Sequence, residues 1–117
     1  MNLVKLPFLE NSFRTIYADP PWNEAGGGRI KRGADRHYPL MKTSEICALR
    51  SEIKRVAFEN SHLYLWVTNN FLLDGLIVME SWGFVYKTTI TWVKPIMGLG
   101  QYYRGMTEHC LFGVRGN

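Results

Sequence analysis

An aspartate, two prolines and a tryptophan, Asp19-Pro20-Pro21-Trp22, directly follow a strand-like segment at residues 13–18. Two successive prolines supply no backbone N–H and fix two φ angles. We therefore expect the carbonyls of Asp19 and Pro20 to stay free to accept hydrogen bonds from a ligand. A carboxylate, a carbonyl and an indole ring together suit a planar ligand with an amino group, because the oxygens accept its N–H bonds while the ring stacks on it.

Such a cluster suits the activation of a weakly nucleophilic amine. The exocyclic amine of adenine is a poor nucleophile because its lone pair is delocalised into the ring. Acceptors on both N–H bonds favour a pyramidal nitrogen, and a preplaced carboxylate stabilises the charge that develops as nitrogen attacks a methyl group. The alternative interpretation, a rigid turn with a surface tryptophan, stays open at this point.

The segments around the motif alternate between strand-like and helix-like patterns, which is typical of an α/β fold with a mostly parallel sheet. Residues 62–68 are almost continuously apolar, which favours a strand covered on both faces. The expected strands are residues 13–18, 62–68, 84–93 and 108–114. In such sheets ligands bind at the carboxyl ends of strands, which here are Asp19, Thr68-Asn69 and Lys94-Pro95.

Two helices are expected between the strands. The first has apolar residues at a spacing of three or four, and the second spans about residues 71–82. The apolar positions of the first helix are Ile46, Leu49, Ile53, Val56 and Ala57. Thr43 or Ser44 is expected to cap the N-terminus of the first helix, and Asn69 or Asn70 that of the second. The second helix is expected to end at Gly83.

The composition is that of one globular domain. The chain has 117 residues, of which 46% are hydrophobic and 21% charged, which argues against disorder, collagen and coiled coil. No apolar run approaches the roughly 20 residues of a membrane span, and the first ten residues do not resemble a secretory signal, so we expect no membrane association and a cytoplasmic location. The spacing of the histidines and of Cys47 and Cys110 predicts reduced thiols and no structural zinc.

Positive charge is concentrated in one glycine-rich segment. The net charge of the chain is +4. Arg29, Lys31, Arg32 and Arg36, offset only by Asp35, form a cationic loop that suits a phosphate backbone. A solvated loop without a partner is the alternative.

The sequence resembles the adenine N6-methyltransferases that carry a DPPW signature, a family with eukaryotic, bacterial and phage members. The resemblance covers nearly the whole chain, with its blocks in the family's order. The blocks are YADPPW (17–22), HYPLMKTSEI (37–46), LYLWVTN (63–69), WGFVYKTTITWVK (82–94), GLGQYYRG (98–105) and TEHCLFGVRGN (107–117).

The resemblance implies a Rossmann-like methyltransferase fold in permuted order, with S-adenosylmethionine as the methyl donor. It implies Asp19, Pro20, Pro21 and Trp22 as catalytic residues, Tyr38, Trp92, Lys94, Glu108 and His109 as substrate-binding residues, and Asp19 as a cofactor-binding residue. In this interpretation the Asp19 carboxylate and the Pro20 carbonyl hold the target amine. Structural roles stay open as alternatives: Trp92 in the core, Lys94 at the rim, His109 as a hydrogen-bonded strand residue and Tyr38 packed under the loop.

The segment 22–36 corresponds to the family's mobile segment over the base pocket. An adenine inside a duplex must be flipped out or be single-stranded before its amine is reached. The implied nucleic-acid-binding residues are Arg29, Lys31, Arg32, Arg36 and Arg104. The compact chain favours DNA over RNA, and bacterial or phage membership over a nuclear eukaryotic protein.

In the family, most of the cofactor-binding part follows the DPPW block. We therefore expect residues 1–117 to be a single partial catalytic domain that alone binds the cofactor poorly. Gly98-Leu99-Gly100 lacks a third glycine and a following helix, so it is not a dinucleotide-binding fingerprint. The resemblance also implies a paired methyltransferase subunit as a partner. Two alternatives remain: an inactive relative that binds nucleic acid or a partner, and a methyltransferase for a small-molecule amine.

Overall fold

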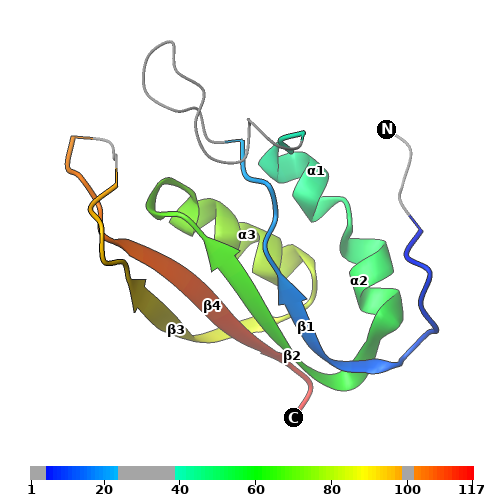
Figure 1. The fold of residues 1–117 in the computed structure, drawn as a ribbon. Helices are drawn as coiled ribbons and strands as arrows, with labels where there is room; N and C mark the ends of the chain where they lie inside the picture. Colours follow the sequence, from blue (N-terminus) through cyan, green and yellow to red (C-terminus); the bar gives the residue numbers. More distant parts are fainter. Residues whose placement is uncertain (1–4, 24–38, 99–101) are drawn as a thin grey trace.

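A mixed α/β architecture, as expected, is present in the computed structural model, which describes residues 5–23, 39–98 and 102–117 (Figure 1). Its four strands form one sheet in the order β1-β2-β4-β3. The strands are β1 (Phe13–Ala18), β2 (Ala57–Val67), β3 (Val85–Val93) and β4 (Thr107–Arg115). The helices are α1 (Thr43–Cys47), α2 (Arg50–Val56), the 3-10 turn η2 (Asn69–Phe71) and α3 (Leu72–Ser81).

The sheet is mixed, so the expectation of a mostly parallel sheet is wrong. Strands β1 and β2 are parallel, with Tyr17 beside Tyr64, but β4 runs antiparallel to both β2 and β3. The segment 94–106 joins β3 to its neighbour β4 as a hairpin, and a hairpin connection makes its strands antiparallel. The carboxyl ends of β1, β2 and β3 therefore meet the amino end of β4 at one edge of the sheet (Figure 1).

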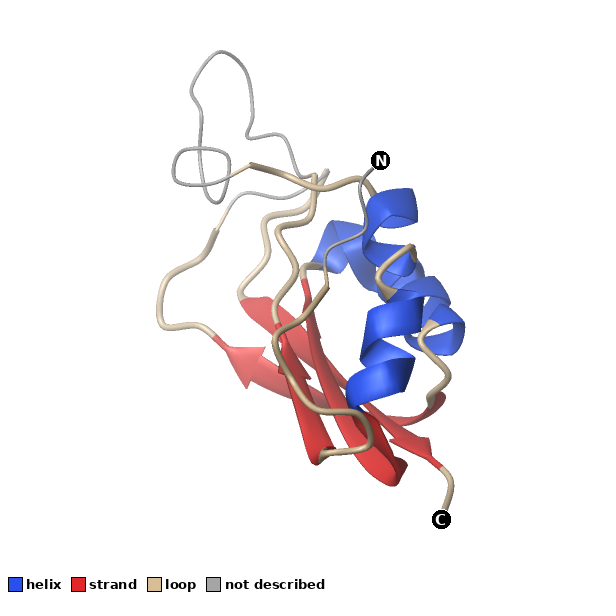
Figure 2. Ribbon diagram, turned by 90° about the vertical axis from the view of Figure 1, so that its right-hand side faces the viewer, coloured by secondary structure: helices blue, strands red, loops and turns tan. Residues whose placement is uncertain are grey.

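All the helices lie on one face of the sheet (Figure 2). Strand β2 sends Leu63, Leu65 and Val67 to this face, where they are buried, and Tyr64 and Trp66 to the other, where they are half-buried. Among the described residues no helix covers that second face, which corrects the expectation that this strand is covered on both sides. The core under the helices consists of Trp22, Ile46, Ile53, Ala57, Leu63, Leu65, Val67, Val78, Met79, Trp82, Phe84 and Leu111.

The first expected helix is two short ones. Helix α1 ends at Cys47, α2 begins at Arg50, and Ala57 is already the first residue of β2. The Glu45 carboxylate accepts the backbone N–H of Lys42 at 2.9 Å, so the N-cap precedes the expected Thr43. The apolar spacing continued across the break because both helices pack on the same face.

Helix α3 agrees with the expected range to within a residue at each end. It stops before Gly83, whose φ of 91° is the left-handed conformation that commonly terminates a helix. Its N-cap is Phe71, which corrects the expected asparagine cap, because the side chain of Asn69 is used elsewhere.

Helix α3 packs closely against the sheet. A side chain at Gly75 would overlap Val67 and Leu111, so glycine permits the close approach. The Trp82 indole N–H donates to the Ile46 carbonyl at 2.9 Å and joins α3 to α1. None of the described helices is long and apolar enough to cross a membrane.

Candidate active site

A small cleft lies where the strand ends meet. Asp19 is the first residue after β1, Thr68 follows β2, and Glu108 stands at the start of β4. The cleft has a volume of about 60 Å³, room for a few water molecules. Its lining residues are Asp19, Trp22, Trp66, Val67, Thr68 and Glu108. The parallel pairing of β1 with β2 and the antiparallel pairing of β4 with β2 together bring Asp19 to Glu108.

Two carboxylates share this cleft with one ammonium group. The Lys94 Nζ lies 3.2 Å from Glu108 Oε1. Burial against the cleft wall, together with the charge of Glu108, raises the pKa of Asp19 above its usual range. The same neighbourhood affects the buried thiol of Cys110, whose pKa is raised by burial and by the charge of Asp19. The cleft therefore has an excess of negative charge when Asp19 is ionised.

Trp22 forms a fixed wall of the cleft. It is 5% exposed, and its indole N–H donates to the Trp66 carbonyl at 2.9 Å. Its ring stacks on Phe71 with centroids 5.6 Å apart and planes 27° apart. The sequence predicted an indole face for stacking on the ligand, but in the structure Phe71 occupies a face of this ring.

The carbonyl of Pro20 is already in use, which corrects the expectation that it stays free. The Trp22 backbone N–H donates to Pro20 O at 2.9 Å, and Met41 N–H donates to Pro21 O at 2.8 Å. The two prolines lack an N–H, but the residue after them has one, and it closes a tight turn. A carbonyl oxygen has two lone pairs, so Pro20 O retains one for a ligand.

Trp92 lies beside the cleft and is not one of its lining residues. It pairs with Glu108 across β3 and β4 and is 49% exposed. Its ring meets Trp66 edge to face, with centroids 6.5 Å apart, and Lys94 Nζ lies 5.9 Å from its centroid. Trp92 thus packs against Trp66, which lines the cleft, and lies near Lys94, which pairs with Glu108.

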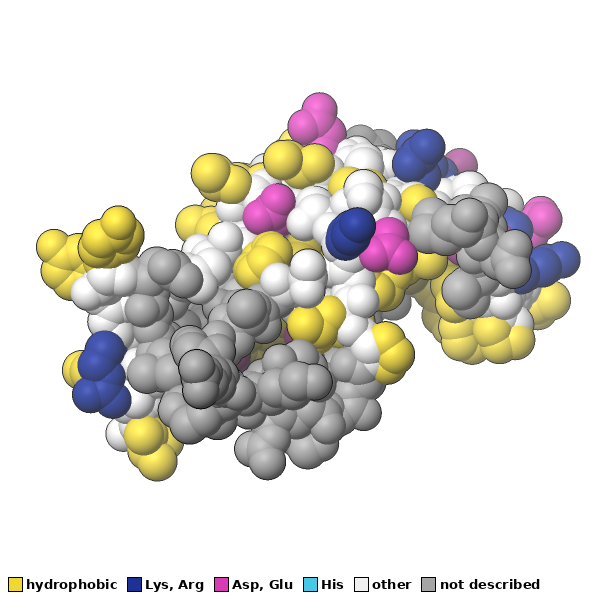
Figure 3. Space-filling model, turned by 90° about the horizontal axis from the view of Figure 1, so that it is seen from above, with side chains coloured by type: hydrophobic (Ala, Val, Ile, Leu, Met, Phe, Trp, Pro, Cys, Tyr) yellow, Lys and Arg dark blue, Asp and Glu magenta, His cyan; other side chains and the backbone are white. Residues whose placement is uncertain are grey.

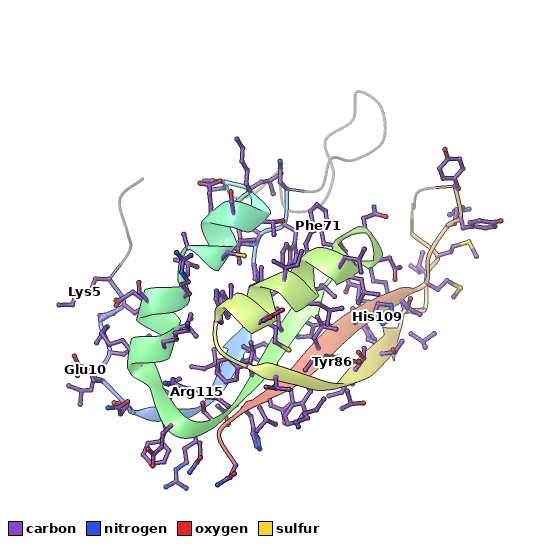
Figure 4. The ribbon with its side chains drawn as sticks, turned by 180° about the vertical axis from the view of Figure 1, so that it is seen from behind. Lys5, Glu10, Phe71, Tyr86, His109 and Arg115 are labelled. Carbon is purple, nitrogen blue, oxygen red and sulfur yellow. The ribbon has the colours of Figure 1, made fainter. Side chains whose placement is uncertain are left out.

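His109 points to the helix-covered face, away from Glu108 (Figure 4). Its Nε2 lies 2.8 Å from Asn69 Oδ1 and its Nδ1 lies 3.1 Å from Thr91 Oγ1. Since Asn69 Nδ2 donates to the Thr107 carbonyl at 3.2 Å, Asn69 Oδ1 is the acceptor and His109 Nε2 the donor in this contact. In the structure His109 is thus a hydrogen-bonded strand residue, and its implied substrate-binding role stays a prediction.

Arg104 closes the loop between β3 and β4. Its Nε donates to Gly98 O at 3.3 Å and its Nη2 to Met97 O at 3.2 Å, so the expected phosphate contact would have to compete with these bonds. The other implied residues, Arg29, Lys31, Arg32, Arg36 and Tyr38, lie outside the described residues.

Trp66 was not predicted from the sequence as a site residue, and Thr68 was predicted only as the end of a strand. Both residues line the cleft, and the Thr68 hydroxyl is buried with no hydrogen-bond partner among the described residues. The alternation of β2 indicates that Trp66 lies on the face opposite Leu65, but which face stays open depends on where the helices pack.

Residues 13–117 match the family model described as MT-A70. The chain is 27% identical over 89% of its length to "Type II methyltransferase M.MunI" of Mycoplasma sp, and spans 52% of that protein. It is 26% identical over 90% of its length to "N(6)-adenosine-methyltransferase catalytic subunit METTL3" of Homo sapiens, and spans 18% of it. A rice relative, "Probable N(6)-adenosine-methyltransferase MT-A70-like", is 30% identical over 90% of the chain, which spans 14% of that protein. The chain thus spans about half the length of the Mycoplasma relative and less than a fifth of the other two.

Proposed function

Since this chain belongs to the MT-A70 family, we propose that it transfers a methyl group to the N6 amine of adenine in nucleic acid. One observation carries the proposal: the Asp19 carboxylate stands at the end of β1 in a cleft with a second carboxylate, Glu108, and aromatic walls. The names of the human and rice relatives support adenosine N6 as the methylated position.

In the proposed reaction Asp19 and Pro20 hold the amine. The Asp19 carboxylate accepts one N–H, and the unused lone pair of Pro20 O accepts the other. Positive charge develops on the nitrogen as it becomes methylated, and the adjacent carboxylate stabilises it. One proton must then leave the nitrogen, and the raised pKa of Asp19 makes this carboxylate a better proton acceptor than an ordinary aspartate.

The cleft chemistry fits a cationic methyl donor. S-adenosylmethionine supplies an electrophilic methyl group when it is bound, and it carries a sulfonium and an ammonium group. Asp19 and Glu108 set two carboxylates against the ammonium of Lys94, so the cleft complements a cationic group. The unpaired Thr68 hydroxyl in the same wall is a further polar group without a protein partner among the described residues. We propose that Asp19 contacts this cofactor as well as the amine.

We favour DNA over RNA as the substrate. The preference follows the likeness to the Mycoplasma type II methyltransferase, whereas the human and rice relatives are named adenosine methyltransferases. The net charge of +4 suits either polyanion.

The test is methyl transfer from tritium-labelled S-adenosylmethionine to adenine-containing oligonucleotides. DNA and RNA of the same sequence are compared, each single- and double-stranded, and the labelled nucleoside is identified by chromatography. Asp19→Asn removes the charge but keeps the shape of the side chain. Glu59→Gln is the matched control, because Glu59 is an exposed carboxylate elsewhere on β2.

A partial domain that binds the cofactor poorly should turn over slowly, so the proposal expects a low but detectable incorporation of label into N6-methyladenine with the wild-type chain and with Glu59→Gln, and at least about 100-fold less with Asp19→Asn. Greater incorporation into RNA than into DNA would reject the DNA preference alone. Label on another atom, or full activity of Asp19→Asn, would reject the proposed chemistry.

A second candidate function is a module that binds nucleic acid or a paired methyltransferase subunit without catalysis. It is favoured by the open face of the sheet, where Val85, Ile90 and Trp92 are 62%, 51% and 49% exposed. Oligonucleotide binding without any incorporated label would support this candidate against the enzyme.

A further inference from the structure

Two adjacent tyrosines stand out from the molecule at the same end of the sheet as the cleft (Figure 1). Tyr102 and Tyr103, in the connection between β3 and β4, have exposed fractions of 101% and 86%. Side chains at the end of this connection project away from the sheet (Figure 4). Seen from above, hydrophobic side chains lie on both sides of one basic side chain at the left of the molecule, where this connection lies (Figure 3). Large aromatic rings normally bury most of their surface, so two adjacent rings exposed to solvent are candidates for binding a ligand.

Hydrogen bonds brace the connection that carries the tyrosines. Lys94 N–H donates to Met106 O at 2.6 Å and Gly98 N–H to Gly105 O at 2.7 Å, so the hairpin continues beyond the strands. The Arg104 guanidinium spans the hairpin to the carbonyls of Met97 and Gly98. Bracing lowers the entropy that the rings lose when they bind a ligand.

The backbone at the first tyrosine is also unusual. Tyr102 has a φ of 63°, a left-handed conformation that a residue other than glycine adopts at an energetic cost. Its side chain is fully exposed, so no burial of the ring offsets that cost.

The connection is continuous with the cleft. Lys94, its first residue, pairs with Glu108 in the cleft wall. Gly105 packs on the Asn69 side chain, which also binds the Thr107 carbonyl. From Lys94 to Met106 the sequence contains two basic residues, Lys94 and Arg104, and no acidic one. A nucleic-acid strand lying along this edge of the sheet therefore passes two basic residues and two aromatic rings.

We propose that Tyr102 and Tyr103 form a stacking platform for the nucleotides that flank the target adenine. Every base has a flat π-face, so stacking holds a strand without reading its sequence, and unpaired bases offer these faces more freely than a duplex does. The proposal rests on the proposed function for the identity of the target base, but it makes its own claim about binding. Loss of each ring is expected to weaken single-strand binding roughly ten-fold, in the lower part of the range for base–aromatic stacking.

The test is binding of the full chain to a fluorescein-labelled single-stranded DNA that contains one adenine with 2-aminopurine on one side. The variant Tyr102→Ala/Tyr103→Ala is compared with Tyr102→Phe/Tyr103→Phe, which keeps the rings. Tyr86→Ala is the matched control, because Tyr86 is a partly exposed tyrosine near the other end of β3. Anisotropy gives affinity, and quenching of 2-aminopurine reports stacking directly.

We expect the double alanine variant to lose about 100-fold in affinity and most of the quenching. The phenylalanine variant and Tyr86→Ala should bind like the wild type. Unchanged affinity and quenching in the double alanine variant would overturn the platform. A change of oligomeric state in that variant, measured by light scattering, with no loss of DNA binding would assign the tyrosines to a protein interface instead.

The same samples separate this proposal from the proposed function. Asp19→Asn should keep the affinity and the quenching while it loses methyl transfer. If no sample transfers methyl groups but binding still depends on the rings, the platform stands and the enzymatic function fails. If methyl transfer depends on Asp19 while binding ignores the rings, the function stands and the platform fails.

Discussion

Two pairs of oppositely charged side chains in this protein show how differently a carboxylate can be used. On α2, Glu52 accepts Arg55 Nε at 2.8 Å and the Leu6 backbone N–H at 2.6 Å, while Arg55 also donates to the carbonyls of Leu6 and Phe8. At the cleft, Glu108 meets Lys94 at 3.2 Å with Asp19 close by. The first cluster fastens the N-terminal segment to a helix, and the second lies where three strands end and one begins.

The pKa values shift in opposite directions at the two places. The hydrogen bond from Arg55 lowers the pKa of Glu52, because every bond there favours the charged carboxylate. Burial and the charge of Glu108 raise the pKa of Asp19. A cluster whose donors and acceptors match is structural, whereas a cluster with surplus negative charge is suited to a cationic or N–H-donating ligand.

The largest expected effect comes from removing the charge of Asp19. Asp19→Asn should lower the rate of methyl transfer by about 100- to 1,000-fold, because the developing charge on nitrogen loses its carboxylate. The melting temperature, measured by calorimetry, should rise or stay the same, since ionised Asp19 disfavours the folded state. If the melting temperature falls together with the activity, Asp19 is a structural carboxylate like Glu52.

The sign of this stability effect depends on pH. Below the ordinary aspartate pKa of 3.8, both states hold the proton and the variant should melt like the wild type. As pH rises through the higher pKa of the folded state, the wild type should lose stability relative to Asp19→Asn. If the difference in melting temperature between Asp19→Asn and the wild type shrinks as pH rises, the pKa of Asp19 is not raised in the folded state.

Removing the cation at the cleft should have an intermediate effect. Lys94→Met keeps a long apolar stem beside Trp92 but leaves Asp19 and Glu108 without their ammonium neighbour. We expect roughly ten-fold less methyl transfer at neutral pH, because Glu108 loses the ammonium group that holds its carboxylate in the cleft wall. Lys87→Met on the exposed side of β3 is the control, and unchanged methyl transfer by Lys94→Met would argue against a role of this ion pair in the reaction.

The smallest effect is expected at the structural pair. Glu52→Gln should lower the melting temperature by a few degrees at neutral pH and leave methyl transfer unchanged, because the Leu6 and Arg55 bonds lose a charged acceptor. The loss should fade as pH falls through the pKa of Glu52, since the wild-type carboxylate then becomes neutral too. Reduced transfer at full stability would show that the two clusters are not independent.

Several elements could be predicted because their signals are local. Strand β1, the stop of α3 at Gly83 and the placement of Asp19 after a strand follow from neighbouring residues. The direction of β4 was not predictable from its own composition, because a strand can have the same residue pattern whether it pairs with a parallel or an antiparallel neighbour. The break between α1 and α2 was also missed, since both helices present apolar residues to the same core.

At the site, one feature had a signal in the sequence. Glu108 and His109 are adjacent in a strand, so their side chains point to opposite faces of the sheet; Glu108 lines the cleft, and the substrate-binding role of His109 stays a prediction. The use of Pro20 O by Trp22 N–H had no such signal, because it depends on how the chain turns after β1. That Trp66 lines the cleft could not be predicted either, because this depends on where the strand ends meet and where the helices pack (Figure 2).

The sequence alone determined the type of chemistry, because a carboxylate, prolines and aromatic residues within four positions after a strand limit what the motif can bind. The tertiary structure decided which groups share the site. Asp19, Thr68 and Glu108 are distant in the chain, and sheet register sets their separation. Register and layer packing arise from long-range burial that no short stretch encodes, and the same burial raises the pKa of Asp19.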